Sequence, residues 1–295
     1  MTEAQKEHKE TTQAGPEYAY YPGCSLHGTA VEFDESVKET ARLLGIGLAE
    51  LDDWNCCGAS SAHMTDHTLA VDLAARNLRI AVETGKELVV PCAACFHRLK
   101  AAQKTLRESS EAGAPNLCRI PVHHIGDLLR SPEVLKKIRD AVKTPLAGLP
   151  LAPYYGCLIT RPPAVTGSTE HEDPQSADLI VKLLGGAPVR WSYKTECCGG
   201  SLTMPRADIT RTLVSRIVRA AARAGAEGIV TMCPMCQANL ESRQLDLKRE
   251  DREHPVLPVF YVTELIAACT ADSRQPRRWK PHLIDPAPLM EARGL

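Results

Sequence analysis

Ten of the chain's 12 cysteines fall into two sets of five that share one spacing pattern. Each set has a single cysteine after a glycine, then an adjacent pair followed by glycine, then a Cys-x-x-Cys motif. In both sets, 34 residues separate the pair from the Cys-x-x-Cys motif. The first set comprises Cys24, Cys56, Cys57, Cys92 and Cys95, and the second comprises Cys157, Cys197, Cys198, Cys233 and Cys236. The doubled pattern predicts two equivalent sites.

Three chemistries compete for such a set of thiols. Structural zinc takes four ligands in a tetrahedron, so five cysteines leave one over in each half. Disulfides are disfavoured because adjacent cysteines bridge only with strain and because cytoplasmic thiols stay reduced. Iron–sulfur clusters suit thiolate-only sites, and four cysteines are their usual complement. Five cysteines then allow a cubane with a spare thiol or an unusual cluster with five thiolates, and we favour iron–sulfur.

Composition and charge narrow the class of protein. The chain has 295 residues and a net charge of −1, with no basic stripe that would favour nucleic acid or a membrane surface. No apolar run reaches the roughly 18 residues that a membrane span needs. The segment Met1–Glu17 is polar and lacks the apolar stretch of a secretory signal. These features favour a cytoplasmic protein, where cysteines serve as metal ligands or redox groups.

Hydrophobic periodicity predicts strands that alternate with helices. We expect strands at 17–21, 47–51, 87–90, 119–122, 151–155, 187–192, 228–232 and 256–260. We expect helices at 29–44, 67–84, 95–108, 124–129, 134–141, 177–184, 207–224 and 263–269. This alternation indicates an α/β fold of two pseudo-repeated domains, each a small parallel sheet flanked by helices. Because ligands collect at the carboxyl ends of parallel strands, we expect the clusters at the C-terminal edges of the strands.

The repeat also predicts the domain boundaries. Residues 1–16 read as a disordered leader, 17–148 as the first domain and 149–272 as the second. The stretch 144–150, rich in proline and glycine, is the expected linker. Residues 273–295 form a tail without periodicity, for which we expect either a place on a partner protein or a frayed end.

These motifs resemble the paired cysteine-rich "CCG" domains of the family of the heterodisulfide reductase B subunit, an iron–sulfur protein family. The resemblance runs from Tyr18 to Ala268 and includes Tyr-Pro-Gly-Cys24, Cys56-Cys57-Gly and Met-Cys233-Pro-x-Cys236. It implies that each five-cysteine set binds one non-cubane [4Fe-4S] cluster, that both face one substrate cleft, and that the protein reduces, or reversibly forms, a disulfide. It also implies a ferredoxin-like C subunit and a flavin-containing A subunit as partners in anaerobic metabolism.

One residue departs from the methanogenic members of this family. In those members a histidine follows the first cysteine of the second domain, whereas this chain has Leu158. A different disulfide, of a small thiol or a protein, therefore becomes the expected substrate. The alternative function is an electron-transfer subunit of an anaerobic dehydrogenase or quinone-linked oxidoreductase. Relatives in which these domains are part of such an oxidoreductase usually also carry ferredoxin cysteine runs, which this sequence lacks. A zinc scaffold is the third alternative.

Histidines supply the candidates for proton donation to a leaving thiolate. We expect His63 to be catalytic because it follows the first cysteine pair, ahead of His97, His123 and His124. Cys118 and Cys269 lie outside both sets, and we expect them to be core thiols. No glycine-rich dinucleotide fingerprint follows the first expected strand, so electrons should come from a partner.

Overall fold

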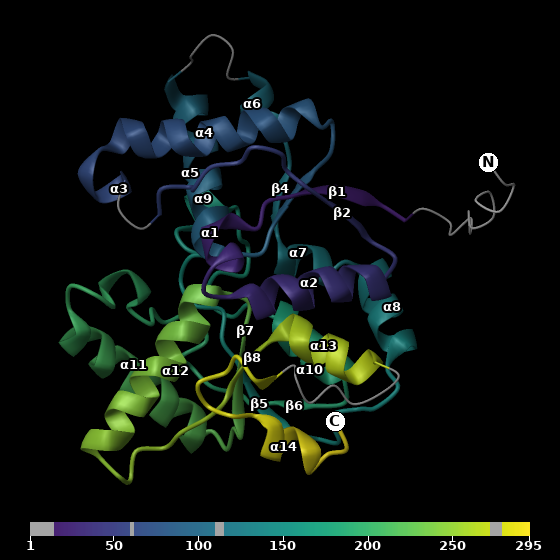
Figure 1. Ribbon diagram of the computed structural model, residues 1–295, viewed down its shortest axis with the longest axis vertical. Helices are drawn as coiled ribbons and strands as arrows, with labels where there is room; N and C mark the ends of the chain where they lie inside the picture. Colours follow the sequence, from purple (N-terminus) through teal and green to yellow (C-terminus); the bar gives the residue numbers. More distant parts are fainter. Residues whose placement is uncertain (1–14, 60–61, 110–114, 272–278) are drawn as a thin grey trace, which may run out of the picture.

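Two small parallel β-sheets, one in each half of the chain, form the framework of the computed structural model (Figure 1). The structure describes residues 15–59, 62–109, 115–271 and 279–295. The strand orders are β2-β1-β3-β4 and β6-β5-β7-β8. The strands are β1 (Glu17–Tyr20), β2 (Gly47–Glu50), β3 (Leu88–Val90), β4 (Val122–His124), β5 (Pro150–Pro153), β6 (Ala187–Pro188), β7 (Gly228–Thr231) and β8 (Val259–Tyr261). The predicted fold class is confirmed.

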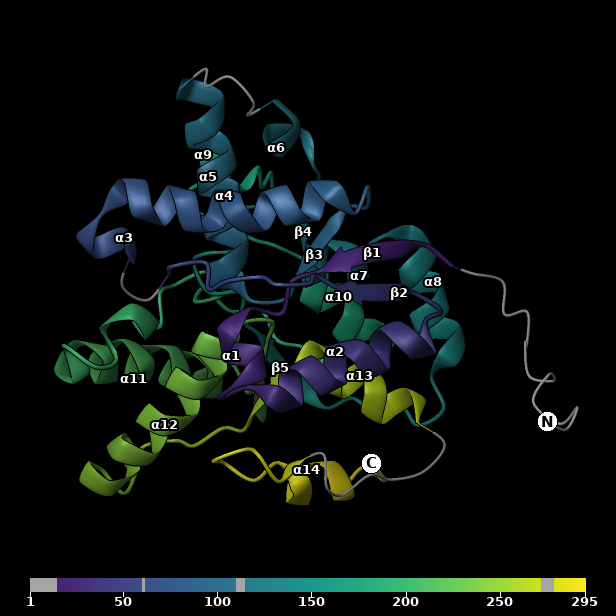
Figure 2. The same ribbon diagram turned by 45° about the horizontal axis from the view of Figure 1, so that its top comes forward.

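Helices flank both sheets (Figures 1 and 2). In the first half they are α1 (Gly23–His27), α2 (Val31–Leu43), α3 (Ala62–Thr65), α4 (His67–Glu83), α5 (Ala93–Ser109), α6 (Pro115–Arg119), α7 (Ile125–Leu129) and α8 (Pro132–Ala141). In the second half they are α9 (Pro163–Thr166), α10 (Ser176–Leu183), the 3-10 turn η1 (Gly200–Leu202), α11 (Ala207–Arg223), α12 (Pro234–Glu250), α13 (Val262–Thr270) and α14 (Ala287–Glu291).

The common strand order explains why the cysteines of each set can meet. All strand pairs are parallel, so the carboxyl ends of each sheet lie on one edge. In each half, the first strand leads to the single cysteine, the second to the adjacent pair, and the third to the Cys-x-x-Cys motif. The first and third strands are neighbours, with the second strand beside the first. Each set is therefore delivered to one sheet edge, as predicted.

Several predicted elements differ from the structure in their bounds, among them the strand expected at 256–260, which begins at Val259. The strand expected at 119–122 begins at Val122 instead and ends at His124, because the buried His124 bonds the Pro91 carbonyl at 3.0 Å and caps α7. The strand expected at 187–192 ends at Pro188, although the Val189 N–H still donates to the Leu151 carbonyl at 2.8 Å. The expected loop at 160–173 contains the short helix α9.

Helix α12 was missed because its buried face is polar. Gln244 exchanges hydrogen bonds with the backbone of Leu257 at 3.0 and 2.7 Å. Asn239 and Glu241 are also buried and hydrogen-bonded. An apolar stripe, which is the usual signal of a packed helix, is therefore absent from this segment.

The two halves share a continuous core. Figures 1 and 2 both place α2 beside α13, which joins the first half to the second. The ring of Phe33 stacks on that of Tyr261, with centroids 4.1 Å apart and planes 8° from parallel. The hydroxyls of Ser36 and Thr263 share a 2.7 Å hydrogen bond. The halves are thus locked together by both apolar and polar contacts.

The described part of the C-terminal tail is packed, so the expectation of a frayed end is wrong for residues 279–295. Trp279 is buried and its ring meets that of Phe260 edge to face at 5.7 Å. His282 lies between Glu241 of α12 and Glu264 of α13, at 3.0 Å from each. Residues 1–14 of the predicted leader and residues 273–278 of the tail lie outside the described residues. Within the described ranges, no helix has both the length and the apolar composition that crossing a bilayer requires.

Candidate functional site

The first cysteine set gathers around the start of α5. Cys92 and Cys95 lie at that helix start and are buried, whereas Cys24 on α1 is exposed. The Sγ atoms of Cys57 and Cys95 are 3.2 Å apart, and those of Cys24 and Cys56 are 3.8 Å apart. Residues separated by up to 71 positions in the sequence thus bring their thiols together.

The second cysteine set surrounds a cavity. All five of its cysteines line a space of about 140 Å³, and the Sγ atoms of Cys198 and Cys236 are 3.6 Å apart. The far wall comes from the first half of the chain, through Ala59, His63, Ala93, Ala94 and Arg98. We call this space the cysteine cavity. Residues of the first half therefore form part of the wall around the second set.

Two glycines permit the close packing of thiols and backbone. Gly23 and Gly156, which precede the single cysteines, have φ angles of +75° and +65°. A Cβ atom on Gly23 would lie 2.7 Å from the Sγ of Cys95, and one on Gly156 would lie 3.0 Å from the Sγ of Cys236. Only glycine fits both the backbone conformation and the contact. The glycine before each single cysteine is therefore a requirement of the site.

The glycine after each cysteine pair contributes a backbone donor. The N–H of Gly58 points to the Sγ of Cys56 at 3.5 Å, and the N–H of Gly199 points to that of Cys197 at 3.3 Å. Such N–H···S contacts favour the thiolate form, which is the form that binds metals. The Cys-Cys-Gly motif thus supplies two thiols and a group that helps to hold one of them ionised.

Hydrogen bonds between the thiols of a set lower the pKa of some cysteines and raise the pKa of others. Hydrogen bonding with Cys56 and Cys95 lowers the pKa of Cys57 to about 3 and raises the pKa values of Cys56 and Cys95. In the second set, the hydrogen bond from Cys157 lowers the pKa of Cys197 to about 6, and the pKa of Cys157 is raised. Five negative thiolates cannot all form at such short range without a cation.

This donor set fits an iron–sulfur cluster. The groups that converge are soft thiols, which bind iron–sulfur clusters and zinc in preference to hard cations. A cationic core would remove the repulsion that keeps protons on Cys95 and Cys236, because metal binding releases thiol protons. The cysteine cavity has room for a group of several atoms. In the described residues, no group of three or more His, Cys, Asp or Glu side chains has the arrangement of a single-ion site.

The predicted histidines lie in different places. His63 on α3 lines the cysteine cavity, so it faces the second set although it follows the first pair in the sequence. Its buried Nδ1 atom has no hydrogen-bond partner within the described part of the chain. His97 is buried nearby, and burial, Arg98 and His63 lower its pKa to about 4. His123 pairs with Glu87 at 2.9 Å, and His124 is a buried capping residue.

Leu158 and Arg98 also belong to the lining of the cysteine cavity. Leu158 lines it, so the residue that departs from the methanogenic pattern lies beside the second set. Arg98 also lines it, and sequence reasoning missed this residue. The signal was present in the spacing, because Arg98 follows Cys95 by three residues on α5 and so shares its helix face.

The remaining cysteines lie away from both sets. Cys269 is fully buried in the core, and burial raises its pKa to about 12. Cys118 on α6 is half-buried, with its Sγ 3.6 Å from the Gln103 carbonyl. Cys269 is therefore the core thiol that we expected, whereas Cys118 packs against the core and is only partly buried.

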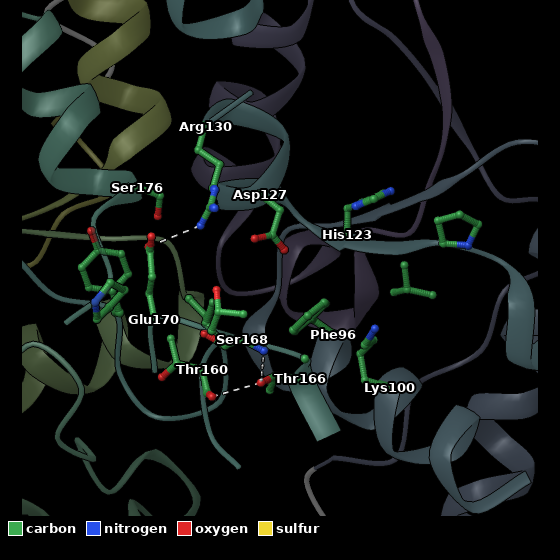
Figure 3. A pocket seen from close by; sticks show the side chains of 17 residues that line it. Phe96, Lys100, His123, Asp127, Arg130, Thr160, Thr166, Ser168, Glu170 and Ser176 are labelled. Atoms are coloured by element: carbon green, nitrogen blue, oxygen red, sulfur yellow. Dashed lines mark hydrogen bonds and ion pairs between the residues drawn. The ribbon is translucent and has the colours of Figure 1, made fainter. Parts of the chain in front are cut away.

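A larger cavity of about 430 Å³ lies elsewhere between the two halves and contacts none of the ten motif cysteines. Figure 3 shows Arg130 pointing to Glu170 on one side of it and Lys100 on another; the ion pair measures 3.4 Å. Its walls combine charged side chains with apolar ones such as Phe96 and Ile159, and it shares only Tyr155 with the cysteine cavity. We place the candidate site at the cysteines because the reactive groups converge there.

The chain belongs to the family of paired cysteine-rich CCG domains that includes the B subunit of heterodisulfide reductase. Residues 18–100 and 151–241 match the CCG cysteine-rich domain, which confirms the resemblance seen in the motifs. Its relatives include subunits of several reductases, so the family is one of oxidoreductase subunits.

Individual relatives fall into two functional groups. The chain is 30% identical over 257 residues to the 8-methylmenaquinol:fumarate reductase membrane anchor subunit of Wolinella succinogenes, covering 85% of this chain and 90% of that protein. It is 25% identical over 269 residues to a protein of Archaeoglobus profundus that is named as like the heterodisulfide reductase B subunit, covering 85% and 90%. It is 24% identical over 260 residues to the B subunit of a CoB-CoM heterodisulfide reductase of Methanosarcina acetivorans, covering 83% and 86%.

One solved structure has the same fold. A hypothetical protein from Helicobacter pylori superposes with a TM-score of 0.68 at 12% sequence identity, covering 92% of this chain. The chain spans about half of that protein, 53% of its length.

Proposed function

We propose that the chain is the catalytic subunit of a heterodisulfide reductase-like complex, which reduces or reversibly forms a disulfide at two non-cubane [4Fe-4S] clusters. The observation that carries this proposal is the convergence of five thiols in each half of a CCG-family protein. The ligands would be the ten motif cysteines, with the first set holding one cluster and the second set the other. The domains would extend over residues 17–148 and 149–272.

The residues of the chain have separate roles in this proposal. When bound, the clusters supply one-electron chemistry, so that the two electrons and two protons needed to turn a disulfide into two thiols arrive in steps. Gly23 and Gly156 let the backbone approach the thiols. Ala93, Ala94 and Leu158 line the cysteine cavity and limit the access of water.

His63 is the proposed proton donor. Its Nδ1 is buried without a partner among the described residues, and its ring lines the cysteine cavity. A thiolate that leaves a disulfide gains stability when a nearby acid protonates it. Because Leu158 cannot donate a proton, His63 from the opposite half is the group best placed to do so.

The proposed substrate is the disulfide of a small thiol or a protein, and the proposed electron donors are partner subunits. The names of the relatives support a complex, and the resemblance implies a ferredoxin-like C subunit and a flavin-containing A subunit. The proposal also places the chain in the cytoplasm during anaerobic metabolism, since thiol ligands need reducing conditions.

A second candidate function has its own support. The fumarate reductase relative, at 30% identity, is named for a quinol and for a membrane anchor. The chain would then pass electrons between a quinol and a partner dehydrogenase, with both clusters as relays. A relay has no need for a proton donor at the second set, whereas the disulfide reaction does.

Reoxidation of the reduced protein separates the two functions. The full chain, loaded with clusters under anaerobic conditions and reduced with dithionite, would be mixed with a panel of low-molecular-weight disulfides or with a water-soluble menaquinone analogue. The proposal predicts reoxidation by at least one disulfide, with two thiols formed per two electrons. Rapid reoxidation by the quinone, with no response to any disulfide and no spectral change with any thiol, would favour electron transfer instead.

A further inference from the structure

The cavity of about 430 Å³ between the two halves is built in part by a segment that is longer in the second half. The sequence has 39 residues between Cys157 and Cys197, but 31 between Cys24 and Cys56. The longer segment contributes residues 159, 160, 166–170, 174 and 176 to the lining. The other walls come mainly from α5, β4 and α7 of the first half. We call this space the interdomain cavity.

Hydrogen bonds within the longer segment fix the wall that it forms. The Thr166 hydroxyl donates to the Thr160 carbonyl at 3.0 Å and accepts from the Ser168 N–H at 3.2 Å, as the dashed lines in Figure 3 show. Thr160 and Thr166 are buried. Gly167, with a φ of +75°, ends α9 and donates its N–H to the Pro163 carbonyl at 2.8 Å. The segment therefore presents Ser168 to the cavity from an ordered backbone.

Lys100 brings a positive charge to the interdomain cavity. It lies on α5, one turn after Phe96, and is half-buried. Its ammonium makes no hydrogen bond or ion pair with the residues that the structure describes. Burial lowers the pKa of Lys100, and the charge of Asp127, which lies beyond ion-pair distance, opposes this effect. Because a partly buried charge is costly without a partner, this position favours a bound anion.

The other charged groups of the lining already have partners. Asp127 accepts a hydrogen bond from the His124 N–H at 3.2 Å, at the start of α7. Glu170 pairs with Arg130 at 3.4 Å. His123 pairs with Glu87 at 2.9 Å. The charge that remains to be neutralised in the interdomain cavity is therefore the positive charge of Lys100.

Hydroxyl groups and apolar surface complete the lining. The hydroxyls of Ser168 and Ser176 make no hydrogen bond within the described ranges, and both residues are half-buried. Figure 3 shows them on the side of the Arg130–Glu170 pair, with Lys100 on the other side of the view and the ring of Phe96 between. The lining thus offers an ammonium at one end, hydroxyls at the other and an aromatic ring between them.

We propose that the interdomain cavity binds a small organic anion, with its carboxylate at Lys100 and a hydrogen-bonding group at Ser168. Its apolar or aromatic body would pack on Phe96 and Ile159. The cavity volume lies within the range of roughly 300–1,000 Å³ that is usual for pockets that bind small molecules. The bound anion would contact both halves of the chain.

This site is separate from the cysteine cavity. It contacts none of the ten motif cysteines and shares only Tyr155 with the cysteine cavity. The inference therefore goes beyond the proposed function and does not require a cluster at either set.

Isothermal titration calorimetry of the anaerobic full-length protein tests the proposal. The probe is para-hydroxyphenylpropionate, which carries a carboxylate and a hydroxyl at opposite ends of an aromatic body. We expect saturable binding at one site per chain. The neutral amide of the same compound should bind at least about 10-fold more weakly, because it cannot form the charge-assisted hydrogen bond with Lys100.

Variants assign the two ends of the probe. Lys100→Gln should weaken binding of the carboxylate by at least about 10-fold and leave binding of the amide unchanged, whereas Lys100→Arg should retain both affinities. Ser168→Ala should weaken binding of para-hydroxyphenylpropionate by about 5-fold and leave phenylpropionate, which lacks the hydroxyl, unaffected. Lys104→Gln is the matched control, because Lys104 lies on the same helix, outside the cavity lining, and pairs with Glu108 at 3.6 Å.

Three results would overturn the inference: no saturable binding of the carboxylate, equal affinity for the carboxylate and its amide, or equal weakening in Lys100→Gln and Lys104→Gln. If Lys100→Gln does not fold, the comparison of carboxylate and amide on the unaltered protein still decides. A protein that contains iron but does not bind the probe would remove this inference and leave the proposed function intact. A protein that binds the probe but contains only zinc would overturn the proposed function alone.

Discussion

A Cβ atom on Gly23 would lie 2.7 Å from the Sγ of Cys95, so the residue before the first motif cysteine is limited to glycine. We predict that Gly23→Ala loses the cluster of the first set, because the added methyl group displaces a ligand. Iron content should fall by about half, since two sets are expected to bind equal clusters. Iron analysis would measure this loss, together with electron paramagnetic resonance, in which each reduced cluster is expected to give a signal of its own.

Gly45→Ala is the matched control for that prediction. Gly45 has a φ of +64°, close to that of Gly23, but a Cβ there meets nothing within 4 Å. This variant should lose roughly 1 kcal/mol of stability through backbone strain and keep all of its iron. Equal iron loss in both variants would mean that strain, and not contact with Cys95, causes the effect.

Much of the fold follows from the sequence, and some of the site does not. The buried strand β3 and the capped helix α4, with Asp66 accepting from the Leu69 N–H at 3.0 Å, have local signals that identify them. The approach of His63 to the second set depends on how the halves pack together, and no local pattern encodes that. Helix α12 was hidden for a different reason, because its buried side chains are polar.

We predict that the C-terminal tail is held by a charged histidine. His282 is buried between Glu241 and Glu264, and these hydrogen bonds raise its pKa to about 10 despite desolvation. His282→Asn should lower the free energy of unfolding by roughly 3–5 kcal/mol, the range for breaking a buried ion pair. Chemical denaturation at pH 6 would measure this difference, and His171→Asn, at a half-exposed position outside the core, is the control.

The pH dependence of that contribution has a definite sign. The pKa is raised in the folded state, so the stabilisation is complete below the unfolded value of about 6.5 and is lost as pH rises to about 10. The melting temperatures of the unaltered protein and His282→Asn should therefore converge between these pH values. A constant or growing difference would contradict a protonated His282.

Substitution of a cysteine in one set should abolish the cluster of that set and leave the other cluster in place. We predict that Cys57→Ser removes the signal of the first set and that Cys198→Ser removes that of the second, because each set converges within its own half. Cys118→Ser should retain both signals, since Cys118 lies outside both sets. Loss of both signals in each of the first two variants would indicate ligands shared between the halves.

His63→Gln should slow disulfide reduction without changing the clusters. General acids contribute about 10²–10⁴-fold to rates, so a decrease of at least roughly 100-fold is expected at neutral pH. Single-turnover mixing of the reduced protein with its disulfide would measure the rate. His123→Gln, which removes a surface ion pair with Glu87, should react normally. A normal rate for His63→Gln would assign proton delivery to water.

The most direct test of the account is the metal content of the anaerobically purified full-length protein. Two four-iron clusters, one at each five-cysteine set, require roughly eight irons and eight acid-labile sulfides per chain. Elemental analysis combined with sulfide determination gives both numbers from one preparation. The account predicts this iron and sulfide content with little zinc. Stoichiometric zinc with negligible iron and sulfide would contradict it.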